Sequence, residues 1–286
     1  MDLVTSLSPL QTLEVAQSQS AKVVKNRGHL ATVFGLLNTR KTGSPWRDVR
    51  LRQALNFAVN RADLIDYAAK GNGVIVPALI PTRGLGYDPD LAPYPFDPGK
   101  ARELLHDASH PDGLRVALIA PEALNVQATV IGKMLEQAGF GVDLQILDPS
   151  SYERRTDLNL LDKPAEQQTW DVALAGQTDW VQFPAFDFYR QVVLDGPMVW
   201  MTEDPELRRL YEETLRTLDQ EKQSRLLRQM ERRVSEQAYF LFLYQPVQLF
   251  AVSKDVEFAP YVTGYLNLAE TSVTDQHRSV RRASAR

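Results

Sequence analysis

The sequence predicts an α/β fold in which a mixed sheet with βαβ crossovers is covered by helices. The main observation is the segment 114–146, where an alternating apolar pattern is followed by a helical pattern and then by a second alternation. These periods are typical of a strand, a helix and a strand. Two strands joined by such a helix run parallel, with a right-handed connection. Further strand and helix patterns on both sides extend the unit into one α/β domain with additional segments at its ends.

The first 45 residues are expected to contain a helix at about residues 9–24 and a buried strand at residues 31–37. The strand segment is apolar and rich in β-branched residues, which suit a pleated surface. A Gly-Ser-Pro sequence at residues 43–45 then interrupts the regular pattern.

Two helices follow, each opened by a residue that can cap it. Asp48 precedes a helix with Leu51, Leu55 and Ala58 on one face, and Asn60 precedes another that ends near residues 70–71. Asp and Asn side chains accept hydrogen bonds from the free N–H groups of a first helical turn. The Gly- and Pro-rich residues 71–95 predict an ordered loop that lies over a surface.

The central part of the chain contains the crossover. Asp97-Pro98 is a strong helix start, because Pro suits the first helical position. The buried stripe of that helix is expected to be Ala101, Leu104, Leu105 and Ala108. Residues 114–120 and 140–146 predict two strands, residues 123–138 predict the helix between them, and residues 170–176 predict a third buried strand.

The C-terminal third is expected to form two amphipathic helices and two strands. Asp204-Pro205 starts a helix with Leu207, Leu210, Tyr211 and Leu218 facing inward, and residues 220–236 form a charged helix. Residues 239–252 predict two strands interrupted by Pro246. The charged clusters Glu212-Glu213 and Glu231-Arg232-Arg233 are predicted to lie on solvent faces of these helices.

Composition excludes several classes of function. The 286 residues include 44% hydrophobic and 24% charged residues, which is ordinary for a globular protein. The net charge of −4 argues against nucleic acid as a partner. With no cysteine, disulfides, thiolate metal sites and cysteine nucleophiles are excluded. The first residues lack the basic and apolar regions of a signal peptide, and no run of 18 apolar residues occurs.

Catalytic signatures are also missing from the sequence. There is no Gly-x-Ser-x-Gly elbow, no His-Glu-x-x-His and no Gly-rich phosphate loop, so neither an enzyme nor a bound cofactor is expected. His106 and His110 have a spacing that can place two imidazoles on one metal. Their helix ends there, however, and the sequence indicates no third ligand, so no metal site is expected.

Three segments occur in an order that is specific to one family. They read Trp-Arg-Asp-Val-Arg-Leu-Arg-Gln-Ala-Leu-Asn-Phe-Ala-Val-Asn-Arg at 46–61, Gly-Tyr-Asp-Pro-Asp-Leu at 86–91 and Tyr-Pro-Phe-Asp-Pro-Gly-Lys-Ala at 94–101. Together they resemble the second-lobe opening of the family 5 extracellular solute-binding proteins, the peptide and nickel receptors of ABC importers. The resemblance continues to about residue 270.

The resemblance implies a periplasmic-binding-protein-like lobe that captures a peptide or a similar small solute without covalent chemistry. It also implies ABC permease subunits as partners, no cofactor, and a periplasmic or membrane-anchored extracellular location. Such receptors are about twice this long, so the chain is expected to be the C-terminal half of one. Residues 40–243 would form lobe II, while residues 1–39 and 244–286 would hold the two hinge strands and pieces of lobe I.

The segment Gly176-Gln-Thr-Asp-Trp-Val-Gln-Phe-Pro-Ala-Phe-Asp-Phe188 resembles the ligand loop of the family. There the first aspartate pairs with the α-ammonium group of a peptide. An ungapped match puts Trp180 at that position and Asp179 one residue early, so either the loop shifts and Asp179 binds an amine, or that contact is lost. The expected ligand-binding residues are Gln177, Thr178, Asp179, Trp180 and Phe183.

Two departures from the family leave the ligand and the function open. Residues 120–122 and Leu174 supply no Arg or Lys for a peptide carboxylate, which leaves room for a longer peptide, a cationic ligand or a glycan. The alternative function is a truncated or split fragment that binds nothing and serves, if at all, as an interaction or regulatory domain. Without the missing N-terminal lobe as partner, the hinge strands are expected to be exposed and to favour self-association. Their apolar residues are Val33, Phe34, Leu36, Leu37, Phe242 and Phe250.

Overall fold

The large sheet of this protein has six strands and is mixed, as predicted. The computed structural model describes residues 2–5, 7–178, 184–264, 266 and 268–284. The strand order is β4 (Gly73–Ile75), β8 (Phe240–Pro246), β3 (Ala31–Leu37), β7 (Val172–Thr178), β5 (Arg115–Pro121) and β6 (Gly141–Leu147). Strand β5 runs parallel to β6 and to β7, and the other pairs are antiparallel. Helix α5 (Asn125–Gln137) connects β5 to β6 and completes the expected crossover.

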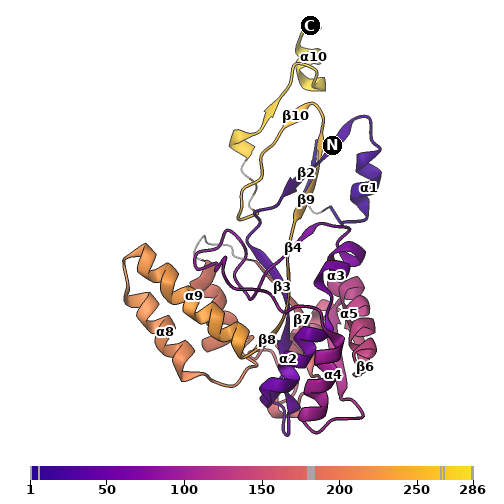
Figure 1. The fold of residues 1–286 in the computed structure, drawn as a ribbon. Helices are drawn as coiled ribbons and strands as arrows, with labels where there is room; N and C mark the ends of the chain where they lie inside the picture. Colours follow the sequence, from indigo (N-terminus) through magenta and orange to yellow (C-terminus); the bar gives the residue numbers. More distant parts are fainter. Residues whose placement is uncertain (1, 6, 179–183, 265, 267, 285–286) are drawn as a thin grey trace.

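One face of the large sheet is covered by α2 (Val49–Ala58), α3 (Arg61–Ala68), α4 (Pro98–Asp107) and α5 (Figure 1). The first three begin at the predicted caps: Asp48, Asn60 and Asp97 accept hydrogen bonds from backbone N–H groups of the first helical turns. Side chains of the four helices form one core with alternate residues of β3, β5, β7 and β8.

The other face is covered by α8 (Pro205–Arg216) and α9 (Gln220–Glu236), together with α7 (Pro184–Tyr189) and the π-helical turn Arg190–Leu194. Helix α6 (Pro149–Thr156) follows β6. The prediction that Leu218 faces inward is wrong, because its side chain is 98% exposed. Helix α8 ends at Arg216, so Leu218 lies in the link to α9 and no longer follows the buried stripe.

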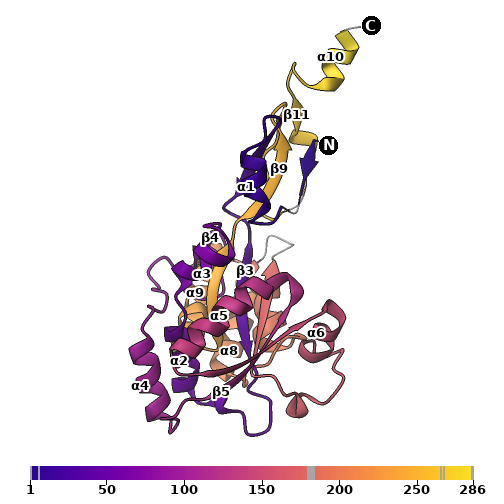
Figure 2. The same cartoon turned by 90° about the vertical axis from the view of Figure 1, so that its right-hand side faces the viewer.

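A second, smaller sheet extends from one end of the large sheet (Figures 1 and 2). Its order is β1 (Leu3–Val4), β9 (Gln248–Ser253) and β2 (Ala21–Asn26), all antiparallel, with α1 (Gln11–Ala16) beside it. The helix predicted at residues 9–24 is therefore only partly correct. Its last residues form β2, because they pair with β9 from the far end of the chain. Strands β10 (Val256–Glu257) and β11 (Ser272–Val273) and helix α10 (Arg278–Ser284) follow.

The strands that connect the two sheets are buried, which corrects the expectation of exposed hinge strands. Strand β3 lies between β8 and β7, and β8 continues directly into β9. The six apolar side chains on which that expectation depended, those of Val33, Phe34, Leu36, Leu37, Phe242 and Phe250, are all buried. They are covered by helices of this chain and by the small sheet, so they offer no exposed patch for self-association.

The residues that carry the family resemblance have structural roles. The buried Arg61 guanidinium donates from Nε to the carbonyl oxygen of Phe242 at 2.7 Å and from Nη2 to the Asn56 side-chain oxygen at 2.9 Å. Asn56 in turn donates to the Phe240 carbonyl oxygen at 2.9 Å. Arg52 donates from Nε to the Gln237 carbonyl oxygen at 2.9 Å. These contacts fasten α2 and α3 to the start of β8.

Candidate functional site

The candidate site lies at the edge of the large sheet that faces the small sheet. Strands β5 and β7 are parallel and end at this edge, and the end of β7, Thr178, pairs with the first residue of β3, Ala31. Strand β8 ends at the same edge and passes through Pro246 into the small sheet. In α/β proteins ligands bind outside the carboxyl ends of parallel strands, so this edge is the first place to expect a ligand.

The predicted ligand loop opens from this edge. The backbones of Gln177 and Thr178 belong to β7, where they pair with Thr32 and Ala31. Helix α7 then starts at Pro184. Asp179, Trp180 and Phe183 lie outside the described residues, so their contacts stay predictions. A Cβ atom built on Gly176 would meet no atom of the described residues within 4 Å.

A hollow of about 360 Å³, called here the edge hollow, lies between the two sheets on the α3 and α5 side. Its polar lining includes a half-buried pair, in which the Gln127 side-chain nitrogen donates to the Tyr244 hydroxyl at 3.1 Å. The whole lining is formed by Thr5, Leu7, Pro9, His29, Val33, Ala69, Asn72, Leu124, Gln127, Tyr244, Pro246, Val247, Gln248 and Leu249. This lining is mainly apolar, with a few amide and hydroxyl groups, as in many small-ligand sites.

Gln245 fixes the chain where it crosses this edge. Its fully buried side-chain oxygen accepts from the Thr82 amide at 2.9 Å, and its nitrogen donates to the carbonyl oxygens of Arg27 and His29 at 3.1 and 3.0 Å. The loop that contains Thr82 and the connection from β2 to β3 are therefore held by one side chain. Burial lowers the pKa of His29, so its imidazole is neutral at physiological pH.

The prediction for the cluster at residues 231–233 is wrong for Glu231, whose side chain is buried. Its Oε2 atom accepts from the backbone amides of Leu79 at 3.0 Å and Ile80 at 2.8 Å. Its Oε1 atom accepts from the Tyr189 hydroxyl. Burial raises the pKa of Glu231 to about 7, although the three hydrogen bonds oppose that rise. Sequence analysis missed this group because its three donors lie far away in the chain.

The two neighbouring arginines join α9 to other segments instead of being simply solvated. Arg232 forms an ion pair from Nε to buried Asp88 at 2.6 Å, and Arg233 forms one to buried Asp204 at 2.6 Å. Asp88 belongs to the Gly-Tyr-Asp-Pro segment of the family pattern, so that aspartate anchors a loop. Asp204 also caps α8 by accepting from the Leu207 amide.

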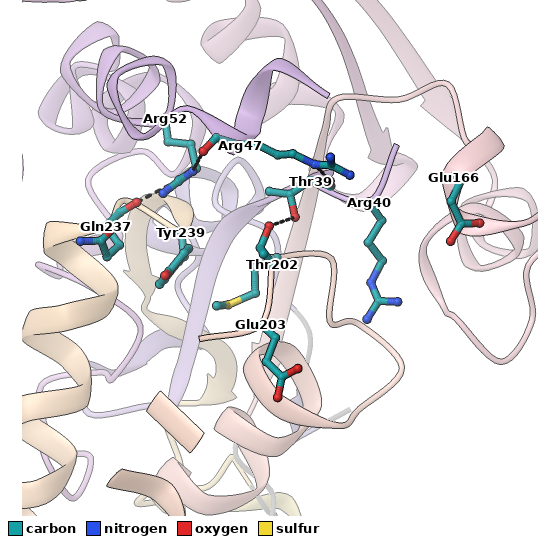
Figure 3. Close-up of a pocket in the computed structure, with 10 residues that line it drawn as sticks. Thr39, Arg40, Arg47, Arg52, Glu166, Thr202, Glu203, Gln237 and Tyr239 are labelled. Carbon is teal, nitrogen blue, oxygen red and sulfur yellow. Dashed lines mark hydrogen bonds between the residues drawn. The ribbon is translucent and has the colours of Figure 1, made fainter. Parts of the chain in front are cut away.

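A second hollow, of about 630 Å³, lies at the opposite edge, where β3 ends and β7 and β8 begin (Figure 3). Its arginines are engaged by the backbone: Arg40 donates from Nε to the Val199 carbonyl oxygen at 2.7 Å and Arg47 to the Thr39 carbonyl oxygen at 3.0 Å. Because this hollow lies at the amino ends of β7 and β8, we interpret these side chains as anchors of the turns around it.

Metal-binding geometry is not found around the histidine pair. His106 is exposed on α4 and lies 3.6 Å from the carboxylate of its neighbour Asp107. Among the described residues, no group of three or more His, Asp or Glu side chains is arranged to hold a metal ion. Within the same residues, no helix combines the length and apolar character needed to cross a membrane.

A sequence model of the bacterial extracellular solute-binding proteins of family 5, described as the middle part, matches residues 1–196. The structure adds two sheets joined by the β2–β3 and β8–β9 connections, with a hollow between them. The chain belongs to the family 5 extracellular solute-binding proteins.

Among curated relatives, the glutathione-binding protein GsiB of Salmonella typhimurium is 29% identical over an alignment of 227 residues, and the match covers 71% of this chain and 43% of that protein. Among solved structures, the DppA periplasmic binding protein of Helicobacter pylori, in complex with the peptide STSA, superposes with a TM-score of 0.78 and 21% identity. The superposition covers 90% of this chain and 49% of the DppA chain.

The putative peptide-binding protein AppA of Clostridium difficile superposes with a TM-score of 0.81 and 15% identity, over 96% of this chain and 56% of its own. At these identities, both structures show that the fold is that of a periplasmic binding protein. The chain spans about half the length of the proteins it matches.

Proposed function

We propose that this chain is part of the substrate-binding component of an ABC importer and captures a peptide or a similar small solute. The observation that carries the proposal is the position of the end of β7, which leads into the candidate ligand loop, at the edge between the two sheets. Membership of the family and the edge hollow support it. The permease and the periplasmic or extracellular location follow from the same family assignment.

We assign residues 40–243 to lobe II of the receptor, and residues 1–39 and 244–286 to the hinge strands and to part of lobe I. The two connections that cross the edge, through residues 26–31 and through Pro246–Gln248, then act as the hinge. Closing two lobes on a ligand excludes water and strengthens each polar contact. The mechanism is noncovalent: the ligand shifts the population toward the closed form that the permease recognises.

The ligand contacts in this proposal come from the loop after β7. Trp180 and Phe183 supply an apolar or planar wall, and Asp179, Gln177 and Thr178 supply polar contacts. No Lys or Arg is present at residues 120–122 or at position 174 to pair with a carboxylate. This favours peptides that are not clamped at both ends, such as peptides of three or more residues.

Isothermal titration of the chain with a mixed library of short peptides tests the proposal. We expect weak, saturable binding that Trp180→Ala abolishes or weakens. Circular dichroism of the variant controls for folding. Binding that Trp180→Ala leaves unchanged would place the site elsewhere, and no binding at millimolar peptide would favour a fragment that acts only as an interaction domain.

A further inference from the structure

The buried carboxylate of Glu231 connects three segments that are distant in the sequence. It projects from α9 and accepts hydrogen bonds from the Leu79 and Ile80 amides and from the Tyr189 hydroxyl. The side chain is 1% exposed, and none of the ion pairs among the described residues includes it. Three neutral donors therefore hold a carboxylate that no cation compensates. Such a group is costly to bury unless every bond is made.

The donors lead to both ends of the candidate ligand loop. Tyr189 is the last residue of α7, the helix that follows the loop. Leu79 connects to the strand that precedes the loop. Its carbonyl oxygen accepts a hydrogen bond from the Thr32 hydroxyl at 2.8 Å. Thr32 pairs with Gln177, the last but one residue of β7, which leads into the loop. The entry and the exit of the loop are thus joined through one side chain.

We propose that Glu231 is a positioning residue that holds the entry and the exit of the ligand loop in one arrangement. The proposal rests on the proposed function in so far as the loop lines the ligand site. The residue touches no ligand itself. It acts through Tyr189 on the helix after the loop and through the 79–80 backbone on β3 and β7.

Protonation of Glu231 is coupled to this arrangement. The titratable groups that act on it are Tyr189 on α7 and Asp88 on the facing loop, and Asp88 is itself paired with Arg232 at 2.6 Å. Burial outweighs the hydrogen bonds and raises the pKa of Glu231. A local opening of the segments around Glu231 that admits water returns its pKa toward the ordinary value of a glutamate. The opening therefore becomes easier as pH rises through the neutral range.

Hydrogen exchange of the whole chain tests the proposal without any ligand. In Glu231→Ala, the three donors lose their acceptor, and exchange should rise by about tenfold in both residues 76–82 and residues 184–194. In Glu231→Gln, the amide oxygen can accept both backbone bonds and the amide nitrogen can donate to Tyr189, so protection should persist. The matched control is Glu236→Gln, an exposed glutamate on the same helix.

The pH profile separates positioning from a general loss of stability. After correction for intrinsic rates, wild-type exchange in both segments should increase between about pH 6 and pH 8, and Glu231→Gln should show no such increase. If Glu231→Ala does not fold, this profile alone decides. Exchange that rises in only one of the two segments, or a Glu231→Gln profile equal to that of the wild type, would overturn the proposal.

A peptide-binding measurement distinguishes failure of the proposed function from failure of the positioning role of Glu231. With the mixed peptide library as probe, Glu231→Ala should weaken binding by about tenfold and Glu236→Gln should leave it unchanged. If the wild-type chain binds no peptide, the proposed function fails, while the exchange results still decide the role of Glu231. Peptide binding that Glu231→Ala leaves intact would overturn the positioning role alone.

Discussion

The guanidinium of Arg61 donates a hydrogen bond to the side-chain oxygen of Asn56 at 2.9 Å, inside the contact between α3 and β8. The same oxygen accepts from the Phe242 amide at 3.0 Å. Burial lowers the pKa of Arg61 to about 10, which leaves the group charged at neutral pH. Because none of the ion pairs among the described residues includes Arg61, carbonyl and amide oxygens alone solvate its charge.

Replacing Arg61 by Lys should destabilise the fold by about 2 to 3 kcal/mol. The ammonium group cannot reproduce the planar fork that contacts Phe242, Asn56, Val59 and Tyr94, so several buried carbonyl groups lose their donor. Urea denaturation measures the change. Arg216→Lys, on an exposed helix surface, is the control and should stay within about 0.5 kcal/mol. Equal urea midpoints for Arg61→Lys and Arg216→Lys would contradict the stabilising role given to the Arg61 guanidinium.

A matched pair of leucines tests the end of α8. Leu210 is 2% exposed and Leu218 is 98% exposed. Leu210→Ala should therefore cost about 3 kcal/mol of unfolding free energy through lost burial and a new cavity. Leu218→Ala should change it by less than about 0.5 kcal/mol. Thermal or urea unfolding checks both, and a large loss for Leu218→Ala would mean that the helix continues further than described.

The stability contributed by Glu231 should fall as pH rises. Its pKa of about 7 in the folded chain lies above the ordinary value of 4.5, so folding takes up a proton between these values. The favourable contribution is complete below about pH 4.5 and is lost as pH rises through about 7, a change of about 3 kcal/mol. Urea titrations at several pH values give the free energy of unfolding of the wild type and of Glu231→Gln. The difference between the two isolates the contribution of Glu231, since other groups such as His29 titrate in both proteins. A difference in unfolding free energy that does not vary with pH would refute the prediction.

Trp180→Ala should weaken peptide binding more than Asp179→Asn. A buried indole loses about 2 kcal/mol or more when it is truncated, whereas a half-exposed carboxylate loses less than about 1. The preserved interval between Gly176 and Pro184 anchors both ends of the loop, while the carboxylate is displaced by one residue. Titration calorimetry gives the ranking. The reverse order would show that the loop shifts and that Asp179 holds the ligand amine.

Residues 1–286 expressed alone should bind peptides no more tightly than roughly 10 μM, or about 7 kcal/mol. The chain spans about half the length of its relatives, so it should supply about half of the contact surface. Calorimetry with the peptide library measures the affinity. Submicromolar binding would mean that the lobe and the small sheet already enclose the ligand.

The helices that cover the first face could be predicted because their signals are local. Asp48, Asn60 and Asp97 cap their own helices, and the stripe of Ala101, Leu104 and Leu105 is buried as expected. The crossover could be predicted for the same reason, since its two periodic strands and the helix between them are contiguous.

Pairing between distant segments could not be predicted from local patterns. Residues 21–24 continue a helical pattern, yet they form β2 because β9 offers unpaired backbone groups to Ala21–Asn26. The hinge strands are predicted to be exposed because the missing lobe is expected to cover them, whereas helices of this chain cover β3 and β8. Of the candidate ligand residues, the structure describes only the backbones of Gln177 and Thr178.

The sequence by itself determined the α/β class, the βαβ unit, the capped helices and the family, because each depends on residues close together in the chain or in a fixed order. Only the tertiary structure decided that Glu231 is buried. Position 231 lies on the apolar stripe of α9, four residues after Leu227 and three before Val234, but the charge of a glutamate predicts exposure to water unless buried partners are present. Its burial depends on Leu79, Ile80 and Tyr189, which reach it only when the loop and α7 pack against α9. Hydrogen bonds of this kind form between positions in space, and a one-dimensional pattern does not contain those positions.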